Sequence, residues 1–285
     1  MRFHKLHGAS NDFVVVDGRV AADAAAAGGG DEARWATLAV ALCDRRRGVG
    51  ADGLLVLEDS TAQDFRMRYH NADGSTAEMC GNGIRCLAKF ALDTGVTDQR
   101  ALRWETLAGP IATEVLAHDG ASALVRVDMG PPRFAPADIP VEAEGSDVRE
   151  TPFDVAGEAI TLTCVSMGNP HAVTFVDSVD GYELARIGPA VERHARFPER
   201  TNFEVVEVLG PAHLRMRVWE RGVGETMACG TGACAVAVAA RLVRDAGPEV
   251  DVDVPGGRLH VGWDEGGPVM LTGPAETAFT GDFAG

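Results

Sequence analysis

Short apolar runs separated by glycine and polar turns dominate the chain and predict a fold rich in strands. Phe13–Val16 and Leu54–Leu57 are apolar at every position, which is typical of buried strands. Ala275–Phe283 is expected to pair back onto the first half of the chain. Further strands are predicted at Phe65–His70, Ile111–Leu116, Ala123–Asp128, Ile160–Val165, Phe203–Val208, Leu214–Trp219, Val250–Val254, Arg258–Trp263 and Val269–Leu271.

Helical spacing of apolar residues is found in fewer places. It predicts helices at Ala33–Cys43, in the segment between Cys80 and Gly95, and at Glu183–Phe197. The stretch Glu225–Ala240 differs from these, because the residues after its Gly-Thr-Gly turn are Ala, Val and Cys and are apolar on every face. Such a segment predicts a fully buried helix.

An internal duplication organises the chain. Met67–Ala88 aligns without a gap on Met216–Ala237 at an offset of 149, and Gly8–Asp17 matches Gly168–Asp177 at an offset of 160. The second half therefore repeats the first in order as well as in motif. We expect an α+β fold of two pseudo-symmetric domains, each a mixed, mostly antiparallel sheet wrapped around a central buried helix, with the active site in the interdomain cleft. The halves comprise residues 1–130 with 275–285, and residues 131–274, and the segment from Gly130 to Glu150 is the expected linker.

The duplication places one cysteine, Cys80 or Cys229, just before the buried helix of each half. The unpaired N–H groups and positive dipole end of a helix N-terminus favour an anion and should lower the pKa of a neighbouring thiol. Two thiols flanking one carboxylate site suit the removal of an α-proton on one side and its return on the other. Backbone N–H groups that would stabilise the resulting carbanion are expected at Gly81, Asn82, Gly230 and Thr231.

Composition excludes several classes of partner. The net charge of −16 argues against nucleic acid and anionic membrane surfaces, which select for clusters of Lys and Arg. The chain has no evident signal peptide and no run of 18 apolar residues, so a cytoplasmic protein with reduced thiols is expected.

Neither an organic cofactor nor a metal is expected. The only lysines are Lys5 and Lys89, and neither lies in an evident pyridoxal phosphate loop. Gly28–Gly30 is predicted to be a flexible loop rather than part of a dinucleotide fingerprint. The cysteine pairs Cys80/Cys86 and Cys229/Cys234 have spacings that point to different helix faces, which argues against a zinc site.

A further set of motifs runs from one end of the chain to the other: Asn11, Asn71, Met79–Gly83, Gly168–His171, Asn202, Glu220–Gly222, Glu225–Thr226 and Ala228–Gly232. Together they resemble the motifs of the diaminopimelate epimerase family. The resemblance implies a cofactor-independent, homodimeric isomerase that interconverts LL- and meso-2,6-diaminopimelate in lysine and peptidoglycan precursor synthesis. It implies that Cys80 and Cys229 are the acid/base pair. It implies that Gly81, Asn82, Gly230 and Thr231 hold the reacting carboxylate. It also implies that the amino and carboxylate groups of the substrate are bound by Asn11, Asn71, Asn169, Asn202 and Arg221, and that His171 and Glu220 hold the ammonium or tune the thiols.

Some alternatives remain open at the level of sequence. Proline racemases and hydroxyproline epimerases also use two cysteines, but they tend to carry histidine where this chain has Asn82. A thiol redox protein or a non-catalytic amino-acid binder is the rival from another class. Asn71 is also compatible with a simple turn, His171 with a structural histidine, and Gly53 departs from family members that have glutamine there.

Overall fold

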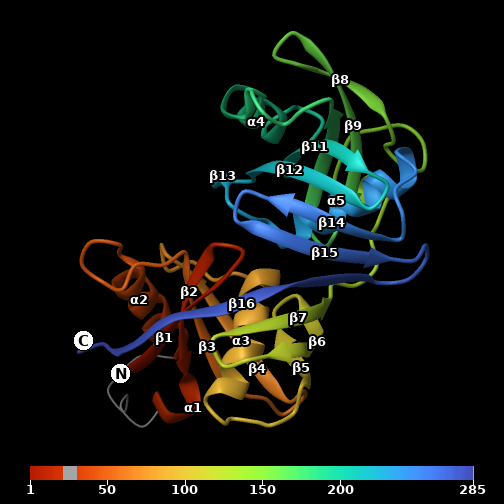
Figure 1. Cartoon of the computed structure of the whole chain (residues 1–285). Coiled ribbons are helices and arrows are strands. Elements are labelled where there is room, and N and C mark those ends of the chain that lie inside the picture. Colours follow the sequence, from red (N-terminus) through yellow and green to blue (C-terminus); the bar gives the residue numbers. More distant parts are fainter. Residues whose placement is uncertain (22–30, 285) are drawn as a thin grey trace. The chain divides into compact units, whose positions relative to one another are not determined.

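The computed structural model describes residues 1–21 and 31–284, which belong to two compact units. Unit 1 comprises Met1–Val127 and Gly273–Gly285, and unit 2 comprises Asp128–Thr272. The loop predicted at Gly28–Gly30 lies outside the described residues. The last strand, β16 (Val269–Asp282), begins in unit 2 and ends in unit 1, which confirms the predicted return of the chain end (Figure 1).

Unit 1 is a closed barrel of mostly antiparallel strands. The order is β1-β2-β3-β4-β5-β6-β7-β16, and β16 closes the barrel by pairing with β1, where Arg2 lies opposite Asp282. The pairs β2–β3 and β4–β5 are parallel. The other strands of the barrel are β1 (Arg2–Gly8), β2 (Asn11–Asp17), β3 (Gly53–Asp59), β4 (Phe65–Asn71), β5 (Ala101–Thr106), β6 (Gly109–His118) and β7 (Ser122–Asp128).

Helices cover both sides of the first strands of unit 1. Inside the barrel lies α3 (Gly81–Asp93), which is buried from its first residue to Ala91, and Leu55 of β3 contacts its first turn. Outside lies α2 (Asp31–Cys43), which packs on the opposite faces of β2 and β3, and the short α1 (Gly18–Ala21) follows β2. The run Phe13–Val16 is apolar throughout because successive residues of a strand point to opposite faces, and here both faces are covered.

Unit 2 repeats this plan with α5 (Gly230–Val243) as its central helix. The strand order is β15-β14-β12-β11-β10-β9-β8, and the pairs β10–β11 and β12–β14 are parallel. The helix α4 (Leu184–Glu192) packs outside the sheet against β8, β11, β12 and β13. The strands are β8 (Thr151–Val155), β9 (Glu158–Ser166), β10 (Pro170–Val176), β11 (Asn202–Gly210), β12 (His213–Glu220), β13 (Gly224–Thr226), β14 (Glu249–Val254) and β15 (Gly257–Trp263).

Two predictions about unit 2 were wrong. The segment from Gly130 to Glu150 is not a linker, since it contains the 3-10 helix η2 (Pro136–Asp138) and buries Ile139, Val141 and Val148 in the core beside α4. The linker prediction failed because the segment is rich in proline and acidic residues, and only a few apolar residues in it pack into the core. The helix predicted over Glu183–Phe197 ends at Glu192.

The strand registers show which residues of the two units occupy equivalent positions, and they correct one part of the sequence alignment. At the offset of 149, Gly53 of unit 1 corresponds to Asn202 of unit 2. Gly53 pairs with Phe13, and Asn202 pairs with His171. His171 therefore occupies the position of Phe13, and Asn169 that of Asn11. The sequence offset of 160 for this segment was wrong by two residues, because the strand registers match Phe13 with His171 and not with Val173.

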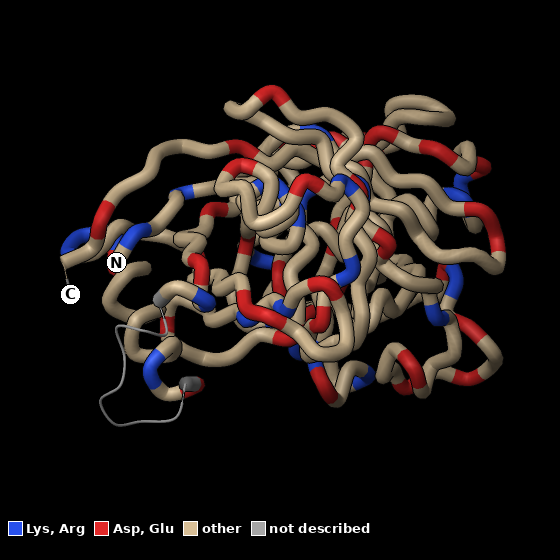
Figure 2. The backbone as a smooth tube through the Cα atoms, turned by 90° about the horizontal axis from the view of Figure 1, so that it is seen from below, with Lys and Arg blue, Asp and Glu red and all other residues tan. Residues whose placement is uncertain are grey.

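Acidic and basic residues are interspersed along the chain, with acidic residues in excess (Figure 2). Within the described ranges, no helix has both the length and the apolar character needed to span a bilayer.

Candidate active site

Each predicted catalytic cysteine is the residue that precedes a central helix. Cys80 (φ −143°, ψ 120°) stands before α3, and Cys229 (φ −119°, ψ 114°) stands before α5, both with extended backbone. The extended residue turns the chain so that the glycine after it begins the helix. The first N–H groups of each helix, which have no acceptor in their own helix, therefore lie next to a thiol.

In unit 1, a hydrogen-bonded set of side chains surrounds Cys80. Its thiol donates to Asn11 Oδ1 at 3.7 Å, and Asn82 Nδ2 donates to the same oxygen at 3.2 Å. Asn11 Nδ2 donates to Asp52 Oδ2 at 2.6 Å, while Arg85 Nη2 donates to Asn82 Oδ1 at 2.9 Å. A carboxylate only accepts and a guanidinium only donates, so Asp52 and Arg85 set the orientation of both amides.

An ion network lies behind Asn11. Lys5, which is 7% exposed, donates to Asp12 Oδ2 at 2.6 Å and to the carbonyl of Gly50. Arg45 Nη2 bridges Asp12 and Asp52 at 2.8 Å each. Burial alone would raise the pKa of Asp12, but hydrogen bonds from Arg45 and Lys5 outweigh it and lower the pKa to about 2.

Replacing Asp12 with asparagine should lower the free energy of unfolding at neutral pH by about 3 kcal/mol, since Lys5 would lose its counter-charge inside the protein. The folded-state pKa of Asp12 lies below its ordinary value of 3.8, so this carboxylate stabilises the fold above that value. Its contribution is lost as the pH falls towards 2. Urea unfolding across the acid range measures the effect.

The control for Asp12 is Asp282→Asn, which breaks an exposed pair with Arg2 and should leave the stability nearly unchanged. Equal stabilities of wild type and Asp12→Asn at neutral pH would contradict this account of the network.

The hydrogen bonds of Asn71 are made within its own turn and not with this set. Its Nδ2 donates to Ser75 Oγ at 3.0 Å, and its backbone N–H donates to the carbonyl of Ser75 at 2.8 Å. These contacts stabilise the turn after β4. Unit 1 therefore brings Asn11, Gly81 and Asn82 to Cys80, while the recorded hydrogen bonds of Asn71 are local.

In unit 2, Cys229 is 6% exposed and its sulfur accepts from the N–H of Gly232 at 3.4 Å. Thr231 Oγ1 lies 3.4 Å from the same sulfur, and Asn169 Nδ2 donates to that hydroxyl at 3.2 Å. Asn169 and Thr231 thus occupy the places of Asn11 and Asn82 in unit 1. His171 is fully buried and contacts Asn169 Oδ1 through Nε2 at 3.0 Å.

The end of β12 brings Glu220 to the same thiol. Glu220 is hydrogen bonded to Cys229 and accepts from the hydroxyl of Thr226. Burial raises the pKa of Glu220 above its ordinary value, and the hydrogen bonds with Thr226 and Cys229 counteract this only in part. A carboxyl group poised in this way can exchange a proton with the thiol beside it.

The expected lowering of the thiol pKa is wrong for Cys229. Burial raises the pKa of this thiol well above its ordinary value, and the carboxylates of Glu220 and Glu204 raise it further. The hydrogen bonds with Thr231 and Gly232 act in the opposite direction and are weaker. At neutral pH these effects favour the thiol form of Cys229 over the thiolate.

A hydrogen bond joins Asn202, the first residue of β11, to Arg221, the residue after β12. Asn202 is 4% exposed, its Nδ2 donates to the carbonyl of Pro170 at 2.8 Å, and its Oδ1 accepts from the backbone N–H of Arg221 at 2.9 Å. The Arg221 side chain is exposed and donates to the carbonyl of Glu199 at 3.1 Å. Asn202 therefore positions the backbone that carries an exposed guanidinium.

The remaining cysteines are core residues. Cys43, Cys86, Cys164 and Cys234 are buried, and burial raises the pKa of Cys43 and of Cys86 to about 12. None of the six cysteines, all of which lie in the described ranges, forms a disulfide. In the same ranges, no group of three or more His, Cys, Asp or Glu side chains is arranged to hold a metal ion.

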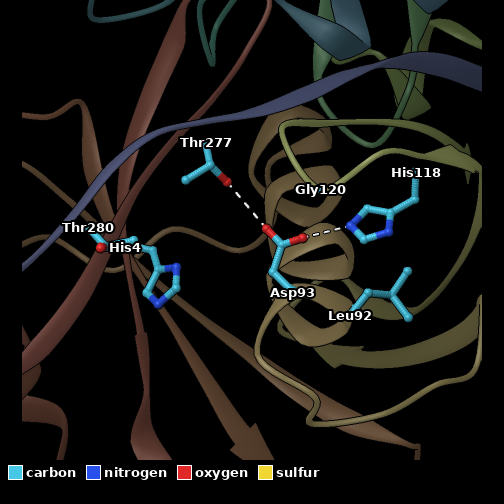
Figure 3. A pocket seen from close by; sticks show the side chains of 7 residues that line it. All are labelled: His4, Leu92, Asp93, His118, Gly120, Thr277 and Thr280. Carbon is cyan, nitrogen blue, oxygen red and sulfur yellow. Dashed lines mark hydrogen bonds and ion pairs between the residues drawn. The ribbon is translucent and has the colours of Figure 1, made fainter.

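A surface pocket of unit 1 lies at the C-terminal end of α3, whereas Cys80 lies at the N-terminal end of that helix (Figure 3). Asp93 lies at the centre of the pocket and contacts His118 Nε2 at 2.7 Å and Thr277 Oγ1 at 3.3 Å. None of the predicted site residues lines this pocket. Its lining consists of His4, Leu92, Asp93, His118, Gly120, Thr277 and Thr280.

Solved structures with this fold include two-domain proteins of related architecture. A phenazine biosynthesis protein of the PhzF family from Bacillus anthracis matches with a TM-score of 0.69 at 17% identity, covering 99% of this chain and 98% of that protein. A hydroxyproline epimerase from Agrobacterium vitis, with bound trans-4-hydroxy-L-proline, matches with a TM-score of 0.66 at 15% identity, covering 99% and 91% of the two chains. These likenesses confirm the predicted α+β fold of two domains, each a mostly antiparallel sheet wrapped around a central helix.

Sequence relatives define the family. The family model of diaminopimelate epimerase matches residues 3–135 and 163–278. The diaminopimelate epimerase of Pelotomaculum thermopropionicum is 46% identical over 286 residues, with 99% of both chains covered. That of Carboxydothermus hydrogenoformans is 48% identical over 283 residues, again with 99% of both chains covered. The chain belongs to the diaminopimelate epimerase family.

Proposed function

We propose that this chain interconverts LL- and meso-2,6-diaminopimelate by inverting one α-carbon, with Cys80 and Cys229 as the acid/base pair. The observation that carries the proposal is the pair of equivalent half-sites in a chain of this family. Each has a cysteine before a buried helix, an asparagine at or just before the start of the neighbouring strand, and a polar residue in the first helical turn.

The chemistry requires a group on each face of the α-carbon. One sulfur, as thiolate, takes the α-proton, and the other, as thiol, donates a proton to the opposite face of the carbanion. Afterwards the first sulfur is a thiol and the second a thiolate, so the two exchange roles in the reverse direction. The helix N–H groups at Gly81, Asn82, Gly230 and Thr231 would stabilise the negative charge that spreads onto the carboxylate.

Glu220 is proposed to exchange a proton with Cys229 between turnovers. The hydrogen bond between them and the raised pKa values of both groups support this role. The proton passes from sulfur to carboxylate without a change in their summed charge, which suits a buried setting. His171 contacts Asn169 rather than a thiol among its recorded hydrogen bonds, so its proposed influence on Cys229 is indirect.

The asparagines and Arg221 are proposed to bind the amino and carboxylate groups of diaminopimelate, most of them at the centre that does not react. The exposed guanidinium of Arg221 has donors in a planar fork that matches a carboxylate. Asn11 and Asn169 would act near the thiols, and Asn71 and Asn202 farther from them.

The setting of the reaction is also a proposal. We place it in lysine and peptidoglycan precursor synthesis, in the cytoplasm and in a homodimer. The absence of disulfides among the six cysteines suits a reducing compartment. Sedimentation equilibrium tests the dimer, and a monomer at micromolar concentration would contradict it.

The experiment that tests the function uses the purified chain and LL-diaminopimelate, without added cofactor. Chiral chromatography should show a mixture of LL and meso isomers approached from either side. L-Proline and trans-4-hydroxy-L-proline serve as matched controls and should remain unchanged. Turnover of either control together with inert diaminopimelate would overturn the proposal in favour of a proline racemase-type enzyme.

A further inference from the structure

A buried carboxylate lies beneath the first turn of α5. Glu204 of β11 is 0% exposed, and its Oε1 lies 2.7 Å from His171 Nδ1, which is buried to the same extent. Its other oxygen, Oε2, is buried and has no hydrogen-bond partner among the described residues. A carboxylate removed from water is unfavourable unless it is fully paired, so its presence here calls for a reason beyond packing.

Unit 1 shows what packing alone requires at this position. In the strand registers, Val15 pairs with Leu55 in unit 1, and Val173 pairs with Glu204 in unit 2. A Cβ atom on Gly83 would lie 3.2 Å from a Leu55 methyl group, and one on Gly232 would lie 2.9 Å from Glu204 Oε1. Leu55 and Glu204 thus contact equivalent helix glycines, and the partner of Glu204 is a histidine where unit 1 has Phe13. Unit 1 therefore forms the same sheet and central helix with the apolar residues Leu55 and Phe13 at these two positions.

The contacts of Glu204 lead stepwise to Cys229. Asn169 donates to Thr231 through Nδ2, so its Oδ1 faces the His171 ring and the ring nitrogen Nε2 must carry a hydrogen. The other nitrogen, Nδ1, then shares a single proton with Glu204, whether the pair is imidazolium and carboxylate or two neutral groups. Thr231 Oγ1 in turn lies 3.4 Å from the Cys229 sulfur.

We propose that Glu204 is a positioning residue for the Cys229 half-site: it holds the His171 ring, which orients the Asn169 amide and, through it, the Thr231 hydroxyl beside the sulfur. The kinetic part of this inference rests on the proposed function. The carboxylate does not touch the substrate. It acts by keeping three side chains in one arrangement, and small displacements at a reacting centre are costly to the rate.

Three variants test the proposal. Glu204→Gln keeps the size and one hydrogen bond to His171, and should lower kcat about 10-fold with a KM within about threefold of wild type. Glu204→Leu introduces the residue of unit 1, leaves His171 Nδ1 without a partner, and should lower kcat about 100-fold. Glu207→Gln is the matched control on the same strand, where the carboxylate accepts from the N–H of Val179, and it should retain wild-type kinetics.

A spectroscopic readout separates positioning from packing. The Nδ1 proton of His171 should give a downfield resonance that moves in Glu204→Gln and disappears in Glu204→Leu. The double variant His171→Phe/Glu204→Leu repeats the apolar pair of unit 1, and it should fold with a melting temperature at or above that of wild type. This double variant should be unable to turn over the substrate.

Several outcomes would overturn the proposal. These are turnover within about threefold of wild type in Glu204→Leu, wild-type turnover with an unchanged His171 resonance in folded Glu204→Gln, or failure of the double variant to fold. If the double variant did not fold, the role of the His171–Glu204 pair would be structural. If the wild-type chain does not act on diaminopimelate, the proposed function fails, while the His171 resonance still tests the contact with Glu204.

Discussion

Alanine in place of either Cys80 or Cys229 should reduce epimerisation by at least about 10⁴-fold, because general acid or base catalysis at one face of the α-carbon is lost and neither thiol can serve both faces. The effect should fall on kcat, since neither sulfur is among the proposed ligands of the carboxylate. Chiral chromatography of LL-diaminopimelate reactions measures it.

The controls for the cysteine variants lie on the same helices. Cys86→Ala and Cys234→Ala remove thiols that are 0% exposed in the cores of units 1 and 2. They should lower stability by about 1 kcal/mol while leaving turnover close to normal. If Cys80→Ala or Cys229→Ala retained near-normal turnover in a folded protein, the two-base assignment would be wrong.

Glu220→Gln should lower kcat about 100-fold and at the same time make Cys229 more reactive towards iodoacetamide. The charge of Glu220 raises the pKa of the Cys229 thiol, so its removal lowers that pKa. The thiolate then forms at lower pH, and the pH profile of alkylation moves downward. Turnover nevertheless falls, because the group that exchanges a proton with the sulfur is gone.

The control for Glu220 is Glu225→Gln, a nearby exposed carboxylate that pairs with Arg217. It should leave both the alkylation profile and kcat unchanged. Peptide mapping assigns the label to Cys229. An alkylation profile of Glu220→Gln that coincides with that of wild type would remove Glu220 from the proton path, as would undiminished turnover.

The sequence was sufficient for the parts of the fold that depend on local pattern. The all-apolar stretch after Gly230 predicts a helix buried on every face, and α5 is that helix. Phe13–Val16 predicts a buried strand, and β2 is covered on both faces. The repeated Cys-Gly-x-Gly motif predicts equivalent cysteines, and both are found immediately before a central helix.

Features that depend on tertiary contacts could not be predicted. Glu204 follows Asn202 and Phe203 in an ordinary alternating strand, and nothing local distinguishes it from a solvated carboxylate. Its partner His171 lies on a parallel neighbouring strand, and the pairing depends on a register that the sequence match placed two residues away. The raised pKa of Cys229 arises first from burial and then from carboxylates on β11 and β12, and a prediction from the helix N-terminus alone includes neither effect.

The most direct test of the two-thiol mechanism is the fate of solvent deuterium during the first turnovers of LL-diaminopimelate in deuterium oxide. Thiols exchange their protons with solvent, so the donating sulfur carries deuterium while the other sulfur removes the substrate proton. We predict that the meso product carries one deuterium, at the inverted α-carbon, while the recovered LL substrate carries none. Deuterium that enters the recovered substrate as fast as the product, or a product that retains its original α-proton, would contradict the mechanism.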